Sequence, residues 1–192
     1  MQPLVLASSS PYRRELLQRL QLPFVWRNPR IDERPLGEET ASIMVQRLAL
    51  NKASSLRSQF LQHLIIGSDQ AAMLDGRMLG KPGSIAAAEQ QLQALSGRSV
   101  TFYTGLCLLD SRSGEYQLGC SPFTVHFRQL SQAQIQRYVA LEKPLDCAGS
   151  FKAEGLGISL FRATEGEDAT SLIGLPLILL CDMLNLAGVA VP

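Results

Sequence analysis

The sequence lacks the features that mark membrane proteins and nucleic-acid-binding proteins. Among its 192 residues no apolar run approaches the roughly 20 that a membrane-spanning helix needs, and the N-terminal run PLVLA is too short for a signal peptide. Lys and Arg number 18 against 17 Asp and Glu, so no bulk charge draws the chain to nucleic acid or anionic lipid. We therefore expect a cytoplasmic protein with neither of these partners, in which any anion site is local.

Cysteine and histidine are also scarce. The four cysteines stand far apart without a C-x-x-C pair, and His63 and His126 are the only two histidines. This scarcity argues against a zinc site and predicts reduced, mostly buried thiols. Neither histidine is accompanied by a nucleophile motif, so a serine–histidine triad is not expected.

Strand-like and helix-like segments alternate along the chain, which predicts an α/β fold. With 46% apolar residues the chain can bury a core as one compact domain, in one or two lobes. Two hairpins, one at Asp75-Gly76 and one within LLDSRSGEYQL, predict a mixed sheet. The expected strands are 4–7, 64–68, 100–109, 123–128 and 157–162, and the expected helices are 11–20, 41–56, 85–95, 132–141 and 177–186.

The stretch LASSSPYRRELL places hydroxyls and arginines where a helix begins. Ser10 and Pro11 are a normal cap and first-turn pair. Arg13 is less expected, because a cation in the first turn costs about 0.3 to 1 kcal/mol unless an anion compensates. Ser8 and Arg13 are therefore either parts of a phosphate cradle or neighbours of an ordinary capped helix with solvated arginines.

The predicted helix ASIMVQRLALNKASSL carries a lysine within its apolar stripe. Lys52 falls among stripe residues that repeat at helical spacing. Its stem either extends along the rim of the core to reach solvent, or it points into a cleft where its charge can meet phosphate. The stripe consists of Ala41, Val45, Leu48, Ala49 and Leu56.

Acidic residues follow two further segments. The buried strand predicted in LIIGSDQ ends at Asp69, at the edge where open α/β sheets bind ligands, although such an aspartate can also be a simple turn former. Glu33 and Asp32 come from an early loop, RIDERP, and Lys81 precedes a proline in LGKPGS. Together these residues suit phosphoryl chemistry with Mg²⁺. The residues available to bind phosphates are Ser8, Arg13, Lys52 and Lys81, and those available to bind a hard cation are Glu33 and Asp69.

These motifs, in this order, resemble the Maf family of nucleoside triphosphate pyrophosphatases over nearly the whole chain, from Leu4 to about Leu184. The resemblance implies a two-lobed α/β domain over residues 1–192, with a strongly curved mixed sheet flanked by helices and a central cleft, similar to the inosine triphosphate pyrophosphatases. It also implies release of pyrophosphate with Mg²⁺ or another divalent metal such as Mn²⁺ or Co²⁺, and a possible homodimer. The motifs are SSSPYRRELL, RLALNKA, IIGSDQ, GKP, LSG, CAGSF and GLP.

The resemblance also assigns roles to single residues. Asp69 matches the general base for the attacking water, although it can alternatively serve chiefly as a metal ligand. The other catalytic or phosphate-contacting positions of the family fall on Ser8, Arg13, Glu33, Lys52 and Lys81.

Three positions bear on the base of the nucleotide. The similarity is greatest to the subgroup that hydrolyses 7-methyl-GTP, whose methylated guanine is positively charged. The resemblance implies that the aromatic face of Tyr12 would attract such a base by about 0.5 to 2 kcal/mol and that Glu154 would oppose its charge, and Gln70 also matches the subgroup. The alternatives are an exposed first-turn aromatic for Tyr12 and a solvated loop charge for Glu154. Tyr12 stands where that subgroup usually has tryptophan, so dTTP, UTP or another modified nucleotide stays an alternative substrate, and a non-catalytic regulator of cell division stays an alternative function.

Overall fold

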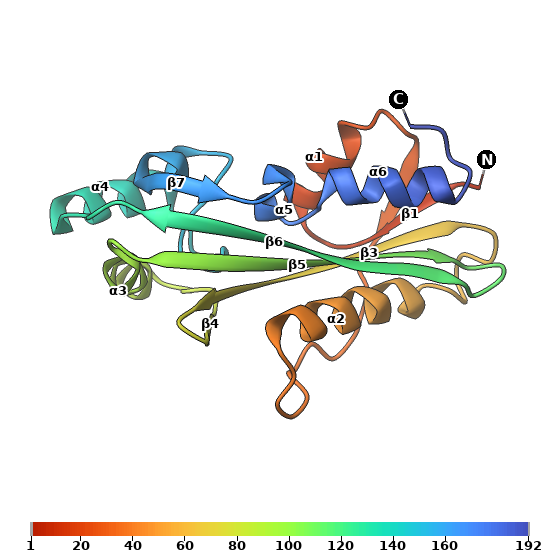
Figure 1. Ribbon diagram of the computed structural model, residues 1–192, viewed down its shortest axis with the longest axis horizontal. Helices are drawn as coiled ribbons and strands as arrows, with labels where there is room; N and C mark the ends of the chain where they lie inside the picture. Colours follow the sequence, from red (N-terminus) through yellow and green to blue (C-terminus); the bar gives the residue numbers. More distant parts are fainter. Residues whose placement is uncertain (1, 192) are drawn as a thin grey trace. The chain divides into compact units, whose positions relative to one another are not determined.

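The computed structural model describes residues 2–191, which form an α/β fold around a seven-stranded mixed sheet (Figure 1). The strand order is β2-β1-β3-β5-β6-β7, with β4 paired to β3. The strands are β1 Leu4–Ala7, β2 Phe24–Arg27, β3 Leu64–Leu74, β4 Arg77–Leu79, β5 Ser99–Asp110, β6 Tyr116–Phe127 and β7 Phe161–Glu165. The helices are α1 Pro11–Gln18, α2 Ala41–Ser55, α3 Ile85–Leu95, α4 Gln132–Glu142, the 3₁₀ turn η1 Leu156–Leu160, α5 Ala169–Ile173 and α6 Leu177–Leu186.

The chain forms two compact units, and the described part of the first covers residues 2–70, 103–121 and 168–191. In this unit β1 lies parallel to both β2 and β3. Alternate strand residues face opposite sides, because side chains have a period of two along a strand. Leu4 and Leu6 pack with α1 and α6, whereas Val5 and Ala7 pack with α2, so helices cover both faces (Figure 1).

Two glycines allow α2 to lie close to the sheet. A Cβ on Gly67 of β3 would stand 2.1 Å from the carbonyl oxygen of Ala49, and one on Gly105 of β5 would stand 2.3 Å from that of Val45. Side chains at these positions would push the helix away. The buried face of α2 consists of Met44, Val45, Leu48, Ala49, Lys52 and Ala53, and Leu56 just after the helix is buried as well. The stripe predicted from the sequence is therefore right for Val45, Leu48, Ala49 and Leu56.

The second unit covers residues 71–102 and 122–167. Its hairpin joins β3 to β4 in antiparallel pairing, and Asp75 and Gly76 both have positive φ, as the turn dipeptide predicts. Helices α3 and α4 pack together. The aromatic core holds edge-to-face ring pairs among Phe102, Phe127, Phe151 and Phe161.

A hydrogen-bonded row crosses the outer strands of this second unit. Ser99 Oγ lies 2.6 Å from His126 Nδ1, and His126 Nε2 lies 3.0 Å from Glu165 Oε1. These three residue types recur in hydrolytic triads, but here the Glu165 side chain is 75% exposed and its charge is solvated. We interpret the row as a cross-strand contact that stabilises the sheet surface.

The sequence prediction is wrong in three places, one of which is the strand expected at 123–128, because β6 begins already at Tyr116. The strand expected to end near Ser68 continues to Leu74, so Asp69 lies inside β3, because the small and apolar residues that follow it also pair with a neighbour. The strand expected at 157–162 is mostly the 3₁₀ turn η1, and β7 begins only at Phe161. The structure also contains β2 and the short helix α5, which the sequence patterns did not predict.

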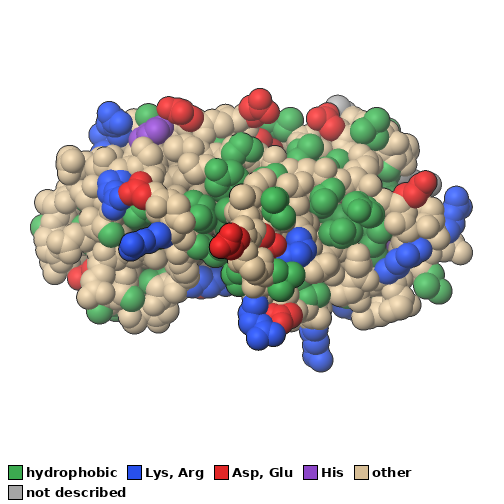
Figure 2. Space-filling view, turned by 60° about the horizontal axis from the view of Figure 1, so that its bottom comes forward, with side chains coloured by type: hydrophobic (Ala, Val, Ile, Leu, Met, Phe, Trp, Pro, Cys, Tyr) green, Lys and Arg blue, Asp and Glu red, His purple; other side chains and the backbone are tan. Residues whose placement is uncertain are grey.

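Other features agree with the sequence more closely. Strand β1 and helices α3 and α6 have the predicted bounds. All four cysteines are free thiols, although only Cys107 is buried and the other three are partly exposed. Acidic and basic side chains are interspersed on the face shown in Figure 2. Within residues 2–191, none of the helices has the length and apolar character that crossing a membrane requires.

Candidate active site

Lys52 is the centre of the candidate site in the first unit. It is only 6% exposed, and its Nζ donates a 2.6 Å hydrogen bond to Asp69 Oδ1, which is itself 8% exposed. The same Nζ lies 2.9 Å from Glu33 Oε1. Lys52 therefore does not extend to solvent, and its ammonium faces two carboxylates; its contact with phosphate in a cleft stays a prediction.

The close packing of α2 on β3 explains why Lys52 meets Asp69. Gly67 faces the helix backbone at Ala49 and Ala53, and Asp69 lies two residues further along the same strand, on the same face. Lys52 stands between those two alanines on α2. The close contact at Gly67 thus brings the Lys52 ammonium and the Asp69 carboxylate together directly from a helix and a strand, with no loop residue involved.

Arg13 approaches the same acidic groups from α1. Its Nε donates a 2.7 Å hydrogen bond to the carbonyl of Gly174, which also accepts a 3.0 Å bond from Ser68 Oγ. Burial lowers the pKa of the Arg13 guanidinium, and the nearby charges of Asp69 and Glu33 act in the opposite direction to raise it. The first-turn arginine therefore faces two carboxylates, which compensates for its unfavourable place at the helix N-terminus.

The serines before α1 shape the turn that carries Arg13. The buried Ser8 hydroxyl accepts a 3.1 Å hydrogen bond from the Ser10 amide, and the Ser10 hydroxyl caps the helix by accepting from the Arg13 amide at 3.4 Å. Arg14 turns the other way and lies 4.2 Å from the ring centroid of Trp26. Tyr12, half-buried, stands beside Arg13 in the same first turn, and its contact with a base stays a prediction.

Gln70 holds the short helix α5 in place. Its amide nitrogen donates to Thr104 Oγ1 at 3.0 Å and to the carbonyls of Ser171 and Leu172 at 2.7 and 3.1 Å. As the neighbour of Asp69 on β3, Gln70 points to the opposite face of the sheet. Any role of Gln70 in substrate binding stays a prediction beside this structural role.

Sequence reasoning missed the residues that fix the Gly174 carbonyl. Asp168 is buried and accepts hydrogen bonds from the amides of Thr170 and Ile178, both at 2.8 Å, so it caps α5 and binds the first turn of α6. Gly174 ends α5 with a φ of +122°. The pattern D-x-T followed by G-L-P was the available signal, because Asp is a preferred N-cap and Gly favours helix ends.

Lys81 and Glu154 belong to the second unit, and both are exposed. Glu154 lies in a turn that Glu142 stabilises, since Glu142 Oε2 accepts a 2.7 Å hydrogen bond from the Leu156 amide. The structure thus brings together Arg13, Glu33, Lys52 and Asp69. The participation of Lys81 and Glu154 in the same site stays a prediction.

The two carboxylates at Lys52 fit the needs of a hard divalent cation. Asp69 Oδ1 and Glu33 Oε1 lie within hydrogen-bonding or ion-pair distance of one nitrogen atom, so they are neighbours. Over residues 2–191, no group of three or more His, Cys, Asp or Glu is placed to hold a metal. Mg²⁺ usually uses one or two carboxylates and takes its remaining ligands from water and substrate phosphate, which matches this pair.

A family model described as Maf-like protein matches residues 3–187, a span that includes all the candidate site residues. The chain belongs to the Maf family. Relatives from Pseudomonas savastanoi pv. phaseolicola and Pseudomonas aeruginosa are each 62% identical to this Maf protein over 192 residues, the whole of both chains. A relative from Alcanivorax borkumensis is 53% identical over 189 residues, which cover 98% of this chain and 96% of its own. All three relatives are named 7-methyl-GTP pyrophosphatase.

Among solved structures, the Staphylococcus aureus Ham1 protein resembles this Maf protein with a TM-score of 0.48 and 15% sequence identity. The likeness covers 81% of this chain and 89% of that one. Membership of the Maf family rests on the sequence matches.

Proposed function

We propose that this Maf protein hydrolyses 7-methyl-GTP to 7-methyl-GMP and pyrophosphate and so removes a modified nucleotide from the cellular pool. Full-length relatives at 53 to 62% identity that carry the name 7-methyl-GTP pyrophosphatase support the substrate. The buried contact between Lys52 and Asp69 supports the reaction and is the observation on which the proposal depends, because it places a potential base beside a cation that can neutralise phosphate.

Asp69 has the role of general base in this proposal. One carboxylate oxygen, Oδ1, accepts a hydrogen bond from Lys52, and we assign the other to the water that attacks the α-phosphorus. A positioned base of this kind contributes about 10² to 10⁴ in rate. Lys52, Arg13 and Lys81 bind and neutralise the phosphates, which is the main task in phosphoryl transfer.

A divalent metal, Mg²⁺ or alternatively Mn²⁺ or Co²⁺, would be held by Glu33 and Asp69 together with substrate phosphate. When bound, it supplies charge that stabilises the departing pyrophosphate. The residues of the chain orient the nucleotide around it. Ser8 lies at the N-terminus of α1, where backbone amides and a hydroxyl can hold phosphate oxygens.

Selectivity for the base is assigned to Tyr12 and Glu154. A methylated guanine carries a positive charge, which the face of Tyr12 attracts by about 0.5 to 2 kcal/mol. Glu154 adds an opposite charge and hydrogen-bond acceptors for the guanine edge. A pyrimidine triphosphate has neither the charge nor the edge that these groups would recognise.

A substrate panel tests the proposal directly. Purified protein with Mg²⁺ is assayed for pyrophosphate release from 7-methyl-GTP, GTP, dTTP and UTP, and kcat/KM is compared. We expect 7-methyl-GTP to be hydrolysed with the highest kcat/KM. Equal or better turnover of dTTP or UTP would overturn the base assignment, and nucleotide binding without turnover of any substrate would favour a non-catalytic regulator.

The variant Asp69→Asn separates catalysis from binding. Its kcat should fall by about 10² to 10⁴ with nucleotide binding retained, because the amide keeps the shape but cannot take a proton. Asp110→Asn is the matched control: Asp110 lies elsewhere in the first unit, where its carboxylate accepts a hydrogen bond from the Gln2 side chain. An unchanged kcat in Asp69→Asn would refute the role of Asp69 as the base.

Location and assembly belong to this proposal as well. The resemblance to the family leads us to infer a cytoplasmic enzyme that acts on a free nucleotide and forms a homodimer. Size-exclusion chromatography with light scattering measures the assembly, and a mass of about 21 kDa, that of one chain, would exclude the dimer.

A further inference from the structure

The segment between β2 and α2 carries Glu33 but has little to hold it. Residues 28–40 form neither helix nor strand, and most of them are exposed. The Glu33 side chain is itself 58% exposed, yet its carboxylate lies 2.9 Å from the buried Lys52 nitrogen. A single ion pair with a largely exposed partner gains little, so another contact must fix this segment.

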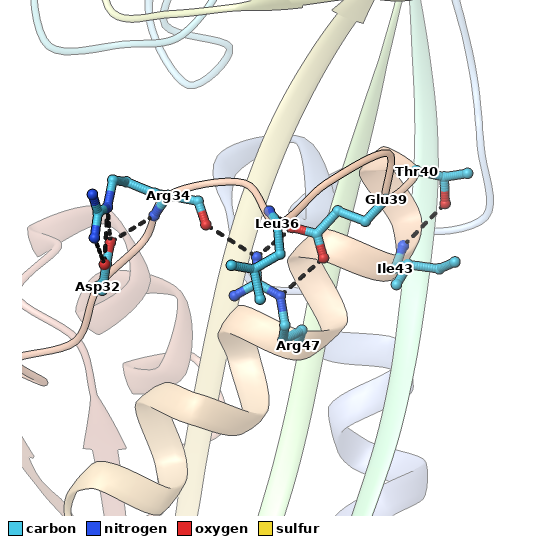
Figure 3. A network of polar contacts seen from close by, with 7 residues as sticks. All are labelled: Asp32, Arg34, Leu36, Glu39, Thr40, Ile43 and Arg47. Atoms are coloured by element: carbon cyan, nitrogen blue, oxygen red, sulfur yellow. Dashed lines mark hydrogen bonds and ion pairs between the residues drawn. The ribbon is translucent and has the colours of Figure 1, made fainter.

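Arg47 of α2 supplies that contact (Figure 3). Its guanidinium donates to the backbone carbonyl of Arg34 at 3.2 Å and pairs with both carboxylate oxygens of Glu39, one of them through Nε at 2.9 Å. Glu39 in turn accepts a 2.9 Å hydrogen bond from the Leu36 amide. One arginine side chain therefore binds the segment at two points, on either side of Leu36.

The contact of Arg47 with Glu39 is better shielded than the neighbouring ion pair, whereas the hydrogen bond from Arg47 to the Arg34 carbonyl is exposed. The side chains of Arg47 and Glu39 are 21% and 10% exposed, whereas the neighbouring pair Arg34 and Asp32 is 85% and 58% exposed. Exposed pairs are screened by water and contribute little, while a bidentate arginine pair that is mostly buried is both stronger and more directional. Arg47 is therefore the main anchor that the structure offers for this segment.

We propose that Arg47 is a positioning residue of the site, which holds Glu33 against Lys52 by fixing the backbone of the adjacent residue, Arg34. Glu33 and Arg34 are consecutive, so a fixed Arg34 carbonyl leaves the Glu33 carboxylate little freedom to leave Lys52. Arg47 also precedes Lys52 by little more than one turn of the same helix, which joins the anchor rigidly to the site. The inference rests on the proposed function, because Arg47 affects the reaction only by positioning Glu33, which the proposed function makes a metal ligand.

The variant Arg47→Gln tests the role. It should raise the Mg²⁺ concentration for half-maximal rate and lower kcat/KM by about 10-fold to 100-fold, the range usual for partners that orient a metal ligand. Arg57→Gln is the matched control: Arg57 follows the same helix, and its substitution removes the same charge and a hydrogen bond to the carbonyl of Ser111 rather than to residues 28–40. The control should keep the wild-type rate and Mg²⁺ dependence.

A double-mutant cycle with Glu33→Gln shows whether Arg47 acts through Glu33. If it does, adding Arg47→Gln to Glu33→Gln should change kcat/KM by no more than about twofold, because the group that Arg47 positions is already lost. Additive losses in the double variant would overturn the inference and leave the proposed function intact. If Glu33→Gln alone keeps the wild-type rate and Mg²⁺ dependence, Glu33 is not a metal ligand, and this inference fails with that role. The role of Asp69 as general base is tested separately by Asp69→Asn.

Limited trypsin digestion gives a readout without metal or substrate. Cleavage at the Arg30–Ile31 bond should be severalfold faster in Arg47→Gln than in the wild type and in Arg57→Gln, because local opening exposes the segment.

Arg47→Lys covers the case in which Arg47→Gln does not fold. Lysine keeps the charge beside Glu39 but cannot bind both points, so intermediate kinetics and cleavage are expected. Wild-type cleavage and kinetics in either variant would overturn the proposal.

Discussion

Lys52 and Asp69 illustrate how the site depends on single residues. Both are mostly buried, and each would be costly to bury alone, because an unpaired charge loses its hydration. Their direct contact, with Glu33 as a third member and Arg13 nearby, makes the burial tolerable. The same contact gives Asp69 a fixed orientation, which a general base needs.

A buried thiol in the same unit predicts a pH dependence of stability. Burial raises the pKa of Cys107 to about 12, whereas a thiol in an unfolded chain titrates near 8.5. Between these values the folded state keeps its proton and the unfolded state loses it. Stability that is fully present below about pH 8.5 is therefore lost as the pH rises toward 12, by up to about 1.4 kcal/mol per pH unit.

The measurement compares the free energy of unfolding of the wild type and Cys107→Ala by urea denaturation from pH 8 to pH 10.5. The difference between them should shift by about 2.5 kcal/mol in favour of the variant over this range. Cys181→Ala is the control, and it should shift less because Cys181 is partly exposed. A difference that does not change with pH would contradict the prediction.

At the scale of elements, the position of α2 on the sheet decides the site. The helix carries both Lys52 and Arg47, and its backbone comes close to β3 at Gly67 and to β5 at Gly105. On the opposite face, α1 supplies Arg13, and the end of α5 supplies the carbonyl that orients it. The charged groups of the candidate site thus come from helices on both faces of the sheet, arranged around strand β3.

Substituting the glycine under α2 should damage both stability and activity. In Gly67→Ala, the added methyl group would stand 2.1 Å from the Ala49 carbonyl oxygen, so the helix must move. We expect a loss of about 1 to 3 kcal/mol in the free energy of unfolding and a marked fall in kcat, because Lys52 moves with the helix. Gly80→Ala, where a methyl group meets no atom within 4 Å, should match the wild type in both measurements. Wild-type stability in Gly67→Ala would show that the packing is looser than described.

At the scale of the whole molecule, the chain combines two compact units into a member of the Maf family. The first unit holds the cluster around Lys52, and the second holds Lys81 and the stabilised turn that carries Glu154. Each unit has its own core, aliphatic in the first and aromatic in the second. The acidic pair at the site has Lys52 as its counter-charge, so we expect the fold to persist without a metal.

Removal of divalent metal should therefore abolish activity without unfolding the protein. In excess EDTA, pyrophosphate release should stop, while the Tm of the nucleotide-free protein should change by no more than about 2 °C, equivalent to less than about 1 kcal/mol. Added Mg²⁺ should restore the rate. Undiminished turnover in EDTA would refute the metal proposal, and a large fall in Tm would indicate a structural metal instead.

Several features of the site could be predicted before the structure. Helix α2 and the lysine within its apolar face follow from the hydrophobic period, and the cap before α1 follows from Ser10 and Pro11. The turn at Asp75-Gly76 follows from local chemistry as well. The length of β3 could not be predicted, because pairing with β4, rather than any local signal near Asp69, keeps the strand going.

The sequence by itself determined the local elements and the family, because periodicity, caps and turn residues act over a few neighbours and the family motifs occur in order. Only the tertiary structure decided which charges meet. Lys52 contacts Asp69 because Gly67 admits the helix, Arg13 is aimed by a carbonyl far along the chain, and Arg47 fixes the segment beside Glu33. Such contacts depend on how elements distant in sequence pack, and no local pattern encodes that.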